Sequence, residues 1–218
     1  MYRDRDYWNE YYSHNAPSVD NKPSDFAKYI ESAFLYEKNP AHILELGCGN
    51  GRDSLFFLSR GHIITAIDGA DVAIERLNRI TNSDNALFVC DDFVKNKELY
   101  QTRFDCIYSR FTLHAISEEQ EDELLDKVRY ALNDNGIFAI EARTTSDELY
   151  GKGKLVENNM FFYNDHYRRF INVNNFRNKL EKLGFDVIYL DESTGFSRMQ
   201  NSDPSLMRCI CASMKTSK

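Results

Sequence analysis

The sequence predicts an α/β fold: one mostly parallel seven-stranded sheet, helices on both of its faces, and a helical cap at the N-terminal end. Short apolar strand patterns alternate with amphipathic helix patterns along most of the chain, and this order generates parallel sheets. A glycine-rich segment, residues 47–51, directly follows the first strand pattern. Acidic residues end several strand patterns, at the sheet edge where α/β proteins bind ligands.

Ahead of the sheet, residues 1–40 form the predicted cap. Its first part is an amphipathic pattern rich in aromatic residues, and Ser24 can cap a second helix over residues 25–35. We expect this cap to close over the ligand site and exclude water. The chain is therefore predicted to be a single compact unit, with the cap at 1–40 and the ligand-binding domain at 41–218.

Four strand patterns and two helix patterns form the first half of the domain. The strands cover residues 42–46, 62–68, 86–90 and 104–109. The helices cover residues 53–60, which Gly61 ends, and residues 70–80. Short apolar runs of this length, bounded by glycine or acidic residues, are typical of buried strands.

The second half begins with a clearly capped helix. Ser117 and Gln120 have the spacing of a capping box, and apolar residues between Leu124 and Leu132 form one stripe. A turn at residues 133–136 leads into a strand at 137–142. A helix at 173–183 and strands at 186–190 and 206–214 complete the pattern.

Composition limits the classes of function. The 218 residues suffice for one domain with a substantial core, and 27 Lys and Arg against 34 Asp and Glu give a net charge of −7. This charge disfavours bulk electrostatic binding to nucleic acid or to an anionic membrane. No apolar run approaches the roughly 18 residues of a membrane helix, and no signal-peptide pattern is present. We expect a cytoplasmic monomer or homodimer without a nucleic-acid or membrane partner.

The glycine-rich segment has the chemistry of a ligand-binding turn. Gly47, Gly49 and Gly51 alternate with other residues, which permits a sharp turn and close approach of the backbone to a ligand. The amide groups of the next helix point into the same space. A dinucleotide fingerprint has the spacing G-x-G-x-x-G, and here the third glycine comes one position early. The fit to NAD is therefore poor.

Acidic residues surround this turn at three strand ends. Asp68 ends the second strand, where its carboxylate can accept hydrogen bonds from both hydroxyls of a ribose. Asp91 and Asp92 end the third strand, and one of them can accept from an adenine amino group. Together with Glu45, these acids suit a cationic nucleoside better than a pyrophosphate, which they would repel.

This combination resembles the class I S-adenosylmethionine-dependent methyltransferases, which have a Rossmann-like fold. The resemblance rests on residues 44–68, on Asp91-Asp92-Phe93 and on the strand at 104–109, and it is firmest over about residues 40–145. The sequence of residues 47–52 is most similar to that of the tellurite-resistance-type subgroup of small-molecule methyltransferases. The resemblance implies S-adenosylmethionine as cofactor, S-adenosylhomocysteine as product and no metal ion.

The resemblance also implies a set of cofactor contacts. The loop residues Gly47, Cys48, Gly49 and Asn50 would line the methionine part, which Glu45 and the backbone carbonyl of Ser109 would also approach. The nucleoside would lie against Asp68, Gly69, Phe93 and either Asp92 or Asp91, and Trp8 with Tyr11 or Tyr12 would face the sulfonium. The alternatives are a structural contact for Glu45, a helix cap or turn for Asp91, and simple core packing for the aromatic residues of the cap.

Candidates for acceptor chemistry follow the fourth strand. Arg110 can clamp a phosphate or carboxylate, and His114 has the chemistry of a general base. The alternative for His114 is a structural, hydrogen-bonded histidine. Methyltransferases that modify nucleic-acid bases resemble one another in an Asn/Asp-Pro-Pro-aromatic motif at this point, and this chain lacks it.

A second group of candidates follows the fifth strand. It combines basic and aromatic side chains, and we expect it to bind an anionic substrate: Arg143, Tyr150, Lys152, Arg168 and Arg169, together with Tyr12 of the cap. His166 is a second candidate base, and Arg110 and Arg143 are also candidates for a catalytic role. The alternative is a solvated face with ordinary salt bridges.

These observations predict a methyltransferase that acts on a small anionic acceptor, most readily through oxygen. The whole chain is also similar to methyltransferases encoded with bacterial surface-polysaccharide genes, some of which modify sugars or phosphoramidate-type groups. Three alternatives remain: a methyltransferase that detoxifies chalcogens such as tellurium or selenium, a non-catalytic protein that binds S-adenosylmethionine, and a methyltransferase that acts on protein or RNA.

Overall fold

The computed structural model describes residues 5–14, 22–198 and 202–213. Two helices precede the sheet, α1 (Arg5–His14) and α2 (Asp25–Ile30), and α2 continues into a π-helical turn, Glu31–Leu35. The other helices are α3 (Arg52–Ser59), α4 (Asp71–Ile80), α5 (Glu118–Ala131) and α6 (Val173–Lys182). No helix in the described part of the chain is long and apolar enough to span a membrane.

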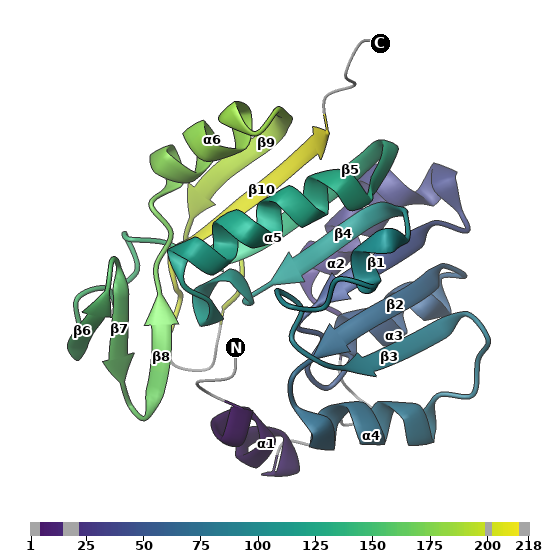
Figure 1. Ribbon diagram of the computed structural model, residues 1–218, viewed down its shortest axis with the longest axis horizontal. Coiled ribbons are helices and arrows are strands. Elements are labelled where there is room, and N and C mark those ends of the chain that lie inside the picture. The colour runs from purple at the N-terminus through teal and green to yellow at the C-terminus, as the bar shows by residue number, and fades with distance from the viewer. Residues whose placement is uncertain (1–4, 15–21, 199–201, 214–218) are drawn as a thin grey trace.

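One seven-stranded sheet forms the centre of the molecule, with the order β3-β2-β1-β4-β5-β10-β9 (Figure 1). Its strands are β1 (His42–Leu46), β2 (Ile63–Asp68), β3 (Ala86–Cys90), β4 (Phe104–Arg110), β5 (Leu132–Arg143), β9 (Phe185–Ser193) and β10 (Leu206–Ser213). β10 is antiparallel to both of its neighbours, β5 and the edge strand β9. The predicted fold class is confirmed. The turn predicted at 133–136 lies instead within β5, where the register against β4 shifts.

Two apolar clusters cover the two faces of the sheet. In β1, Leu44 and Leu46 belong to the cluster that includes α5 and α6, and Ile43 belongs to the one that includes α2, α3 and α4. This alternation follows from the period of two in a strand, and it buries both faces. Because the five strands β1 to β5 are parallel, their carboxyl ends lie at one edge of the sheet.

A small three-stranded antiparallel sheet lies between β5 and α6, and the sequence pattern did not predict it. Its strands are β6 (Lys154–Glu157), β7 (Met160–Tyr163) and β8 (His166–Arg169). It forms a lobe beside the main sheet, on the same side of the molecule as α1 (Figure 1). The turns within it are made by Asn159, Asn164 and Asp165 with positive φ. The lobe therefore places β8 near the edge of the main sheet where the carboxyl ends of β1 to β5 lie.

The predicted capping box of α5 is present and gives a stability test. The Ser117 hydroxyl accepts from the Gln120 amide (3.2 Å), and the Gln120 side chain accepts from the Ser117 amide (3.0 Å). We predict that Ser117→Ala lowers the free energy of unfolding by about 1 kcal/mol in urea denaturation. Ser59→Ala removes an exposed hydroxyl bonded only to the Phe56 carbonyl and should change it by less than about 0.5 kcal/mol. Equal effects of the two changes would contradict the capping role.

Candidate functional site

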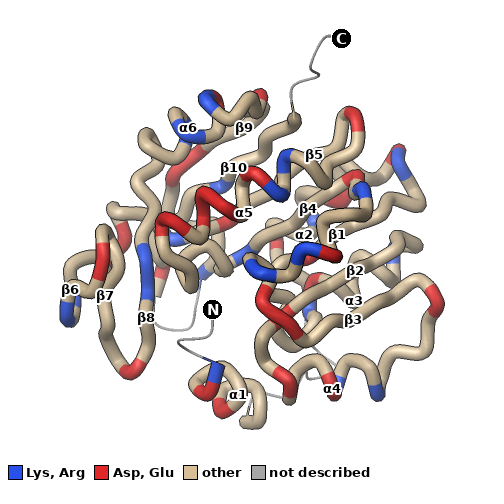
Figure 2. Tube along the Cα trace, in the orientation of Figure 1, with Lys and Arg blue, Asp and Glu red and all other residues tan. Residues whose placement is uncertain are grey.

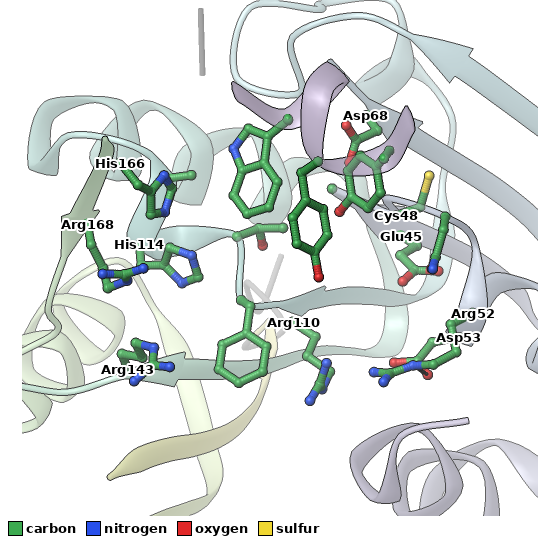
Figure 3. Close-up of a pocket in the computed structure, with 18 of the residues that line it drawn as sticks. Glu45, Cys48, Arg52, Asp53, Asp68, Arg110, His114, Arg143, His166 and Arg168 are labelled. Carbon is green, nitrogen blue, oxygen red and sulfur yellow. Dashed lines mark hydrogen bonds and ion pairs between the residues drawn. The ribbon is translucent and has the colours of Figure 1, made fainter. Parts of the chain in front are cut away.

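The ends of β1, β2 and β4 open into a cavity of about 500 Å³, a size typical of small-molecule sites (Figure 3). Helix α1 bounds it on one side, and β8 with the end of β5 bounds it on another. Most of the residues that the sequence proposed for the site line this cavity: Trp8, Tyr11, Tyr12, Glu45, Gly47, Cys48, Asn50, Asp68, Phe93, Arg110, His114, Arg143, His166 and Arg168. The structure thus brings together groups far apart in the sequence.

The glycine loop is packed from both sides. Gly47 and Gly49 have φ values of 67° and 53°, where a side chain is unfavourable. A Cβ on Gly47 would lie 2.1 Å from Cγ2 of Thr112, and one on Gly49 would lie 2.2 Å from the Tyr12 hydroxyl. Glycine is therefore required at both positions, by the backbone conformation and by the space available.

Asp68 ties the loop to the end of β2. Its Oδ2 accepts from the Gly49 amide (2.8 Å), and its Oδ1 accepts from the Ala70 amide (2.8 Å). Burial raises the pKa of Asp68, although these amide donors oppose the shift. Each carboxylate oxygen has a second lone pair. Asp68 can therefore hold the loop and still accept from two hydroxyls of a ligand.

The two acids after β3 differ in their partners. Both oxygens of Asp91 are used, by the Asp92 amide (2.7 Å) and by the Asn96 side chain (2.9 Å). Oδ1 of Asp92 accepts from the Val94 amide (2.8 Å), but its buried Oδ2 has no hydrogen-bond partner among the described residues. Buried polar atoms are nearly always satisfied, so Oδ2 of Asp92 fits a donor that a ligand supplies.

Two buried carboxyl groups lie behind the glycine loop. Glu45 accepts from the Ser54 hydroxyl, while Asp53 accepts from the Ser24 amide (2.8 Å) and the Tyr108 hydroxyl (2.9 Å). Burial and the nearby Asp53 charge raise the pKa of Glu45 to about 8. Burial also acts to raise the pKa of Asp53, but the Arg52 guanidinium and the Ser24 donors outweigh it and lower that pKa. At pH 7, Asp53 is therefore ionised and Glu45 is mostly protonated.

The opposite part of the cavity is basic. His114, His166, Arg143 and Arg168 lie together there, across the cavity from Glu45, Asp53 and Asp68 (Figure 3). Nδ1 of His114 is buried and has no hydrogen-bond partner within the described ranges. Burial, followed by the charges of His166 and Arg168, lowers the pKa of His114 well below its usual value. His114 is thus a neutral imidazole at pH 7, able to accept a proton.

Arg110 lies between the two parts and is held from behind. Its Nε donates to Glu141 (2.8 Å), and its Nη2 donates to the Ser197 hydroxyl (2.6 Å). Arg208 donates to the other oxygen of Glu141 (2.7 Å). The Glu141 carboxylate therefore holds Arg110 in place, and it is shared between the guanidinium groups of Arg110 and Arg208.

Helix α1 bridges the mouth of the cavity. Arg5 pairs with Asp71 of α4 (3.2 Å), and Arg76 of α4 donates to the Tyr12 carbonyl (3.1 Å). At the other side, Tyr7 stacks on His166 with 4.8 Å between ring centroids, and Trp8 meets the same ring edge-on at 5.2 Å. The aromatic cap is thus connected to both α4 and the small lobe.

Three proposed substrate residues do not line the cavity. Arg169 is buried and bound to Glu121 and to the Ile116 carbonyl (2.8 Å), so it fastens the lobe to α5. The Tyr150 hydroxyl donates to Asn159 (2.9 Å), and Lys152 is exposed on the lobe. Figure 2 shows the acidic residues along α5, to which Arg169 is paired, and the basic residues on β8.

Several cavity residues were not singled out from the sequence. They are Tyr7, Arg52, Asp53, Phe111, Thr112, Ala115, Ser197 and Arg198. Asp53 had a usable signal, since it follows the glycine loop in the first turn of a helix. Five proposed cofactor residues are not among those that line the cavity: Gly49, Gly69, Asp91, Asp92 and Ser109. Gly49 and Ser109 are each bonded to a residue that does line it, Gly49 to Asp68 and the Ser109 hydroxyl to Thr112.

We predict that Gly49→Ala displaces Tyr12 and weakens cofactor binding at least tenfold, because the new Cβ overlaps the Tyr12 hydroxyl. Gly151→Ala is the matched control, since Gly151 also has positive φ (79°) but has no atom within 4 Å of the added Cβ. Calorimetric titration with S-adenosylhomocysteine measures the affinity, and the emission of Trp8, the single tryptophan, reports the position of the cap. Equal losses of affinity in both variants would contradict the packing argument.

Comparisons with known proteins give the family. A family model described as a methyltransferase domain matches residues 19–190. The probable S-adenosyl-L-methionine-dependent methyltransferase TehB of Haemophilus influenzae (strain ATCC 51907 / DSM 11121 / KW20 / Rd) is 25% identical over 144 residues, which are 66% of this chain and 47% of the relative. The chain spans about half the length of the curated relatives it matches.

Solved structures agree with the fold. A putative S-adenosylmethionine-dependent methyltransferase from Listeria monocytogenes has a TM-score of 0.69 at 18% identity, covering 87% of this chain and 99% of its own. The 1,6-didemethyltoxoflavin-N1-methyltransferase of Burkholderia thailandensis, solved with S-adenosylhomocysteine, has a TM-score of 0.69 at 18% identity, covering 98% and 87%. The family model matches most of the chain, including the five parallel strands of the sheet. The chain therefore belongs to the methyltransferase-domain family and has the fold of class I S-adenosylmethionine-dependent methyltransferases, as its sequence predicted.

Proposed function

We propose that the protein transfers the methyl group of S-adenosylmethionine to an oxygen of a small anionic acceptor. The observation that carries this proposal is the division of charge within one cavity. Acids gather beside the glycine loop, and arginines with two histidines gather opposite them (Figure 3). A cationic cofactor suits the first part and an anionic acceptor suits the second.

The acidic part supports specific cofactor contacts. Asp68 would accept from the ribose hydroxyls, and Oδ2 of Asp92 would accept from the adenine amino group, with Phe93 beside the ring. Glu45 would lose its proton when an ammonium group comes near, because a neighbouring cation favours the carboxylate. Tyr12 and Trp8 would present ring faces to a sulfonium. When bound, the cofactor supplies an electrophilic methyl group for in-line displacement.

The basic part supports acceptor binding and activation. Arg143 and Arg168 would attract the anionic group, and Arg143 is itself braced by Asp147 (2.7 Å). His114 is neutral, and its Nδ1 has no hydrogen-bond partner among the residues that the structure describes, so it would accept the proton of an acceptor hydroxyl. Alignment of the acceptor against the methyl group would supply much of the remaining rate.

The biological setting that we propose is surface-polysaccharide modification, on a sugar or a phosphoramidate-type group. Such acceptors combine negative charge with oxygen nucleophiles, which suits the basic part of the cavity. We base this proposal on the similarity of the whole sequence to methyltransferases encoded with bacterial surface-polysaccharide genes. Turnover assays with phosphorylated sugars and uronic acids, described below, test it.

A second candidate function is methylation of a chalcogen oxyanion. It is favoured by the similarity to the TehB relatives and by the same basic lining. A chalcogen nucleophile carries no proton to remove, so this function would not depend on His114. A third, non-catalytic role would give cofactor binding without turnover of any acceptor.

We predict that Asp92→Asn weakens S-adenosylhomocysteine at least tenfold, about 1.4 kcal/mol, because an amide that turns its NH₂ toward the adenine amino group repels it. Asp91→Asn is the control, since both of its oxygens are already used inside the protein, and it should change the dissociation constant less than threefold. Calorimetry on the two variants decides the assignment. A larger loss in Asp91→Asn would reverse it.

We predict that His114→Gln lowers kcat by roughly 10²–10⁴-fold with a hydroxyl acceptor, while the affinity for S-adenosylhomocysteine stays unchanged. The test is a coupled turnover assay over phosphorylated sugars, uronic acids, hydroxybenzoates and tellurite. Because burial lowers the pKa of His114, its base form persists from pH 6 to 8 and kcat should show no histidine inflection there. Full turnover of tellurite by His114→Gln would favour the second candidate function.

A further inference from the structure

Phe111 has a backbone conformation that its side chain disfavours. Its φ is 58°, and four of the five described non-glycine residues with positive φ are Asn or Asp: Asn135, Asn159, Asn164 and Asp165. Asn and Asp tolerate the left-handed region, whereas a bulky aromatic residue there is a genuine outlier. A phenylalanine held there is strained, and strained residues of this kind cluster at active sites and ligand-binding segments.

The turn explains the backbone of Phe111 but not its side chain. After β4, the chain turns so that Thr112 packs its methyl group on Gly47 and bonds Ser109 through its hydroxyl. The Phe111 amide donates to the Glu141 carbonyl (2.8 Å) and fixes this turn. Glycine or asparagine would make the same turn with less strain. The ring must therefore have another use.

Core packing does not supply that use. Phe111 belongs to neither apolar cluster of the sheet and is only partly buried. It lines the cavity instead. The ring of Phe111 is thus only partly removed from water by the protein itself. Its remaining apolar surface would be buried when a ligand covers it, and this burial would favour binding of the ligand.

The surroundings of the ring place it in the acceptor part of the cavity. The Arg110 guanidinium lies 4.4 Å from the ring centroid, and the Arg143 guanidinium lies 5.9 Å from it. The His114 ring centroid is 5.9 Å away. Figure 3 shows Arg143 and Arg110 along the same side of the cavity, with His114 above them. A molecule with its anionic group at Arg143 and its hydroxyl at His114 would lie against Phe111.

We propose that Phe111 is a specificity-determining residue of the acceptor site: its ring packs on a flat apolar face that adjoins the anionic group of the acceptor. This inference rests on the proposed function, because it concerns the acceptor of the same cavity. Either an aromatic ring or the C–H face of a sugar ring offers this chemistry. A compact inorganic oxyanion does not.

Two matched pairs of probes test the proposal with the full chain saturated with S-adenosylhomocysteine. Inorganic phosphate is compared with glucose 6-phosphate, and acetate is compared with 4-hydroxybenzoate, so the second member of each pair adds a ring that carries hydroxyl groups. The Phe111 variants then separate the contribution of the ring face from that of the hydroxyls. Dissociation constants are measured by calorimetry for the wild-type chain, Phe111→Leu, Phe111→Asn and a control, Phe162→Leu. Phe162 is also partly buried, but it packs on Tyr167 in the small lobe and does not line the cavity.

The proposal predicts that in at least one pair the ring-bearing probe binds ten times or more tighter than its partner. Both Phe111 variants should lose this preference and keep their affinity for phosphate and acetate, and Phe162→Leu should retain the preference. Phe111→Asn should also unfold at a temperature no lower than the wild type, because it relieves the strained backbone.

A ring preference that survives in both Phe111 variants, or that is absent from the wild type in both pairs, would overturn the proposal. A clear drop in the unfolding temperature of Phe111→Asn would show that the ring serves the fold and would also overturn it. Failure of the wild-type chain to bind S-adenosylhomocysteine would instead sink the proposed function, so the two failures are distinguishable. A preference for glucose 6-phosphate alone points to a sugar face, and one for 4-hydroxybenzoate alone points to an aromatic ring.

Discussion

The turn at Gly47 to Gly51 is the constraint on which the rest of the site depends. Its positive φ values bring the backbone from β1 into α3 at the sheet edge, and its amides bond the Ile67 carbonyl and the Asp68 carboxylate. Thr112 packs against one glycine and Tyr12 against another. The loop therefore sets the position of the cap, of the chain after β4 and of the acids around it. A side chain at Gly47 would overlap Thr112, and one at Gly49 would overlap Tyr12.

The second organising feature is electrostatic. The ends of β1 and β2 and the start of α3 place Glu45, Asp68 and Asp53 at one end of the cavity. Arg143, Arg168 and the two histidines come from the end of β5, the lobe and the turn after β4. Burial makes each group respond to its neighbours: it raises the pKa of Glu45 to about 8 and lowers the pKa of His114. The protein thus places a carboxyl group that a nearby cation would ionise at one end of the cavity and a neutral imidazole at the other. This arrangement suits the transfer of a methyl group from a sulfonium to an oxygen, which is the reaction that we propose.

The sequence predicted the main sheet well because its signals are local. Strands buried on both faces read as short apolar runs, and Ser117 with Gln120 marks the start of α5. The sequence did not predict the small lobe because its strands have only four residues each, too few to show a clear periodic pattern, and they pair with one another in a sheet of their own. The same lobe explains why Arg168 lines the cavity and Arg169 does not: neighbouring residues of β8 point to opposite faces. The left-handed backbone of Phe111 has no signature in the sequence, since nothing about phenylalanine predicts it.

We assign a cationic nucleoside cofactor to the glycine loop. The most direct test of this assignment is a calorimetric titration of the full chain with S-adenosylhomocysteine, with NADH as the comparison ligand. We expect a micromolar dissociation constant for the first ligand and no detectable binding of the second, since the loop spacing and the acids disfavour a pyrophosphate. Absence of S-adenosylhomocysteine binding, or tighter binding of NADH, would contradict it.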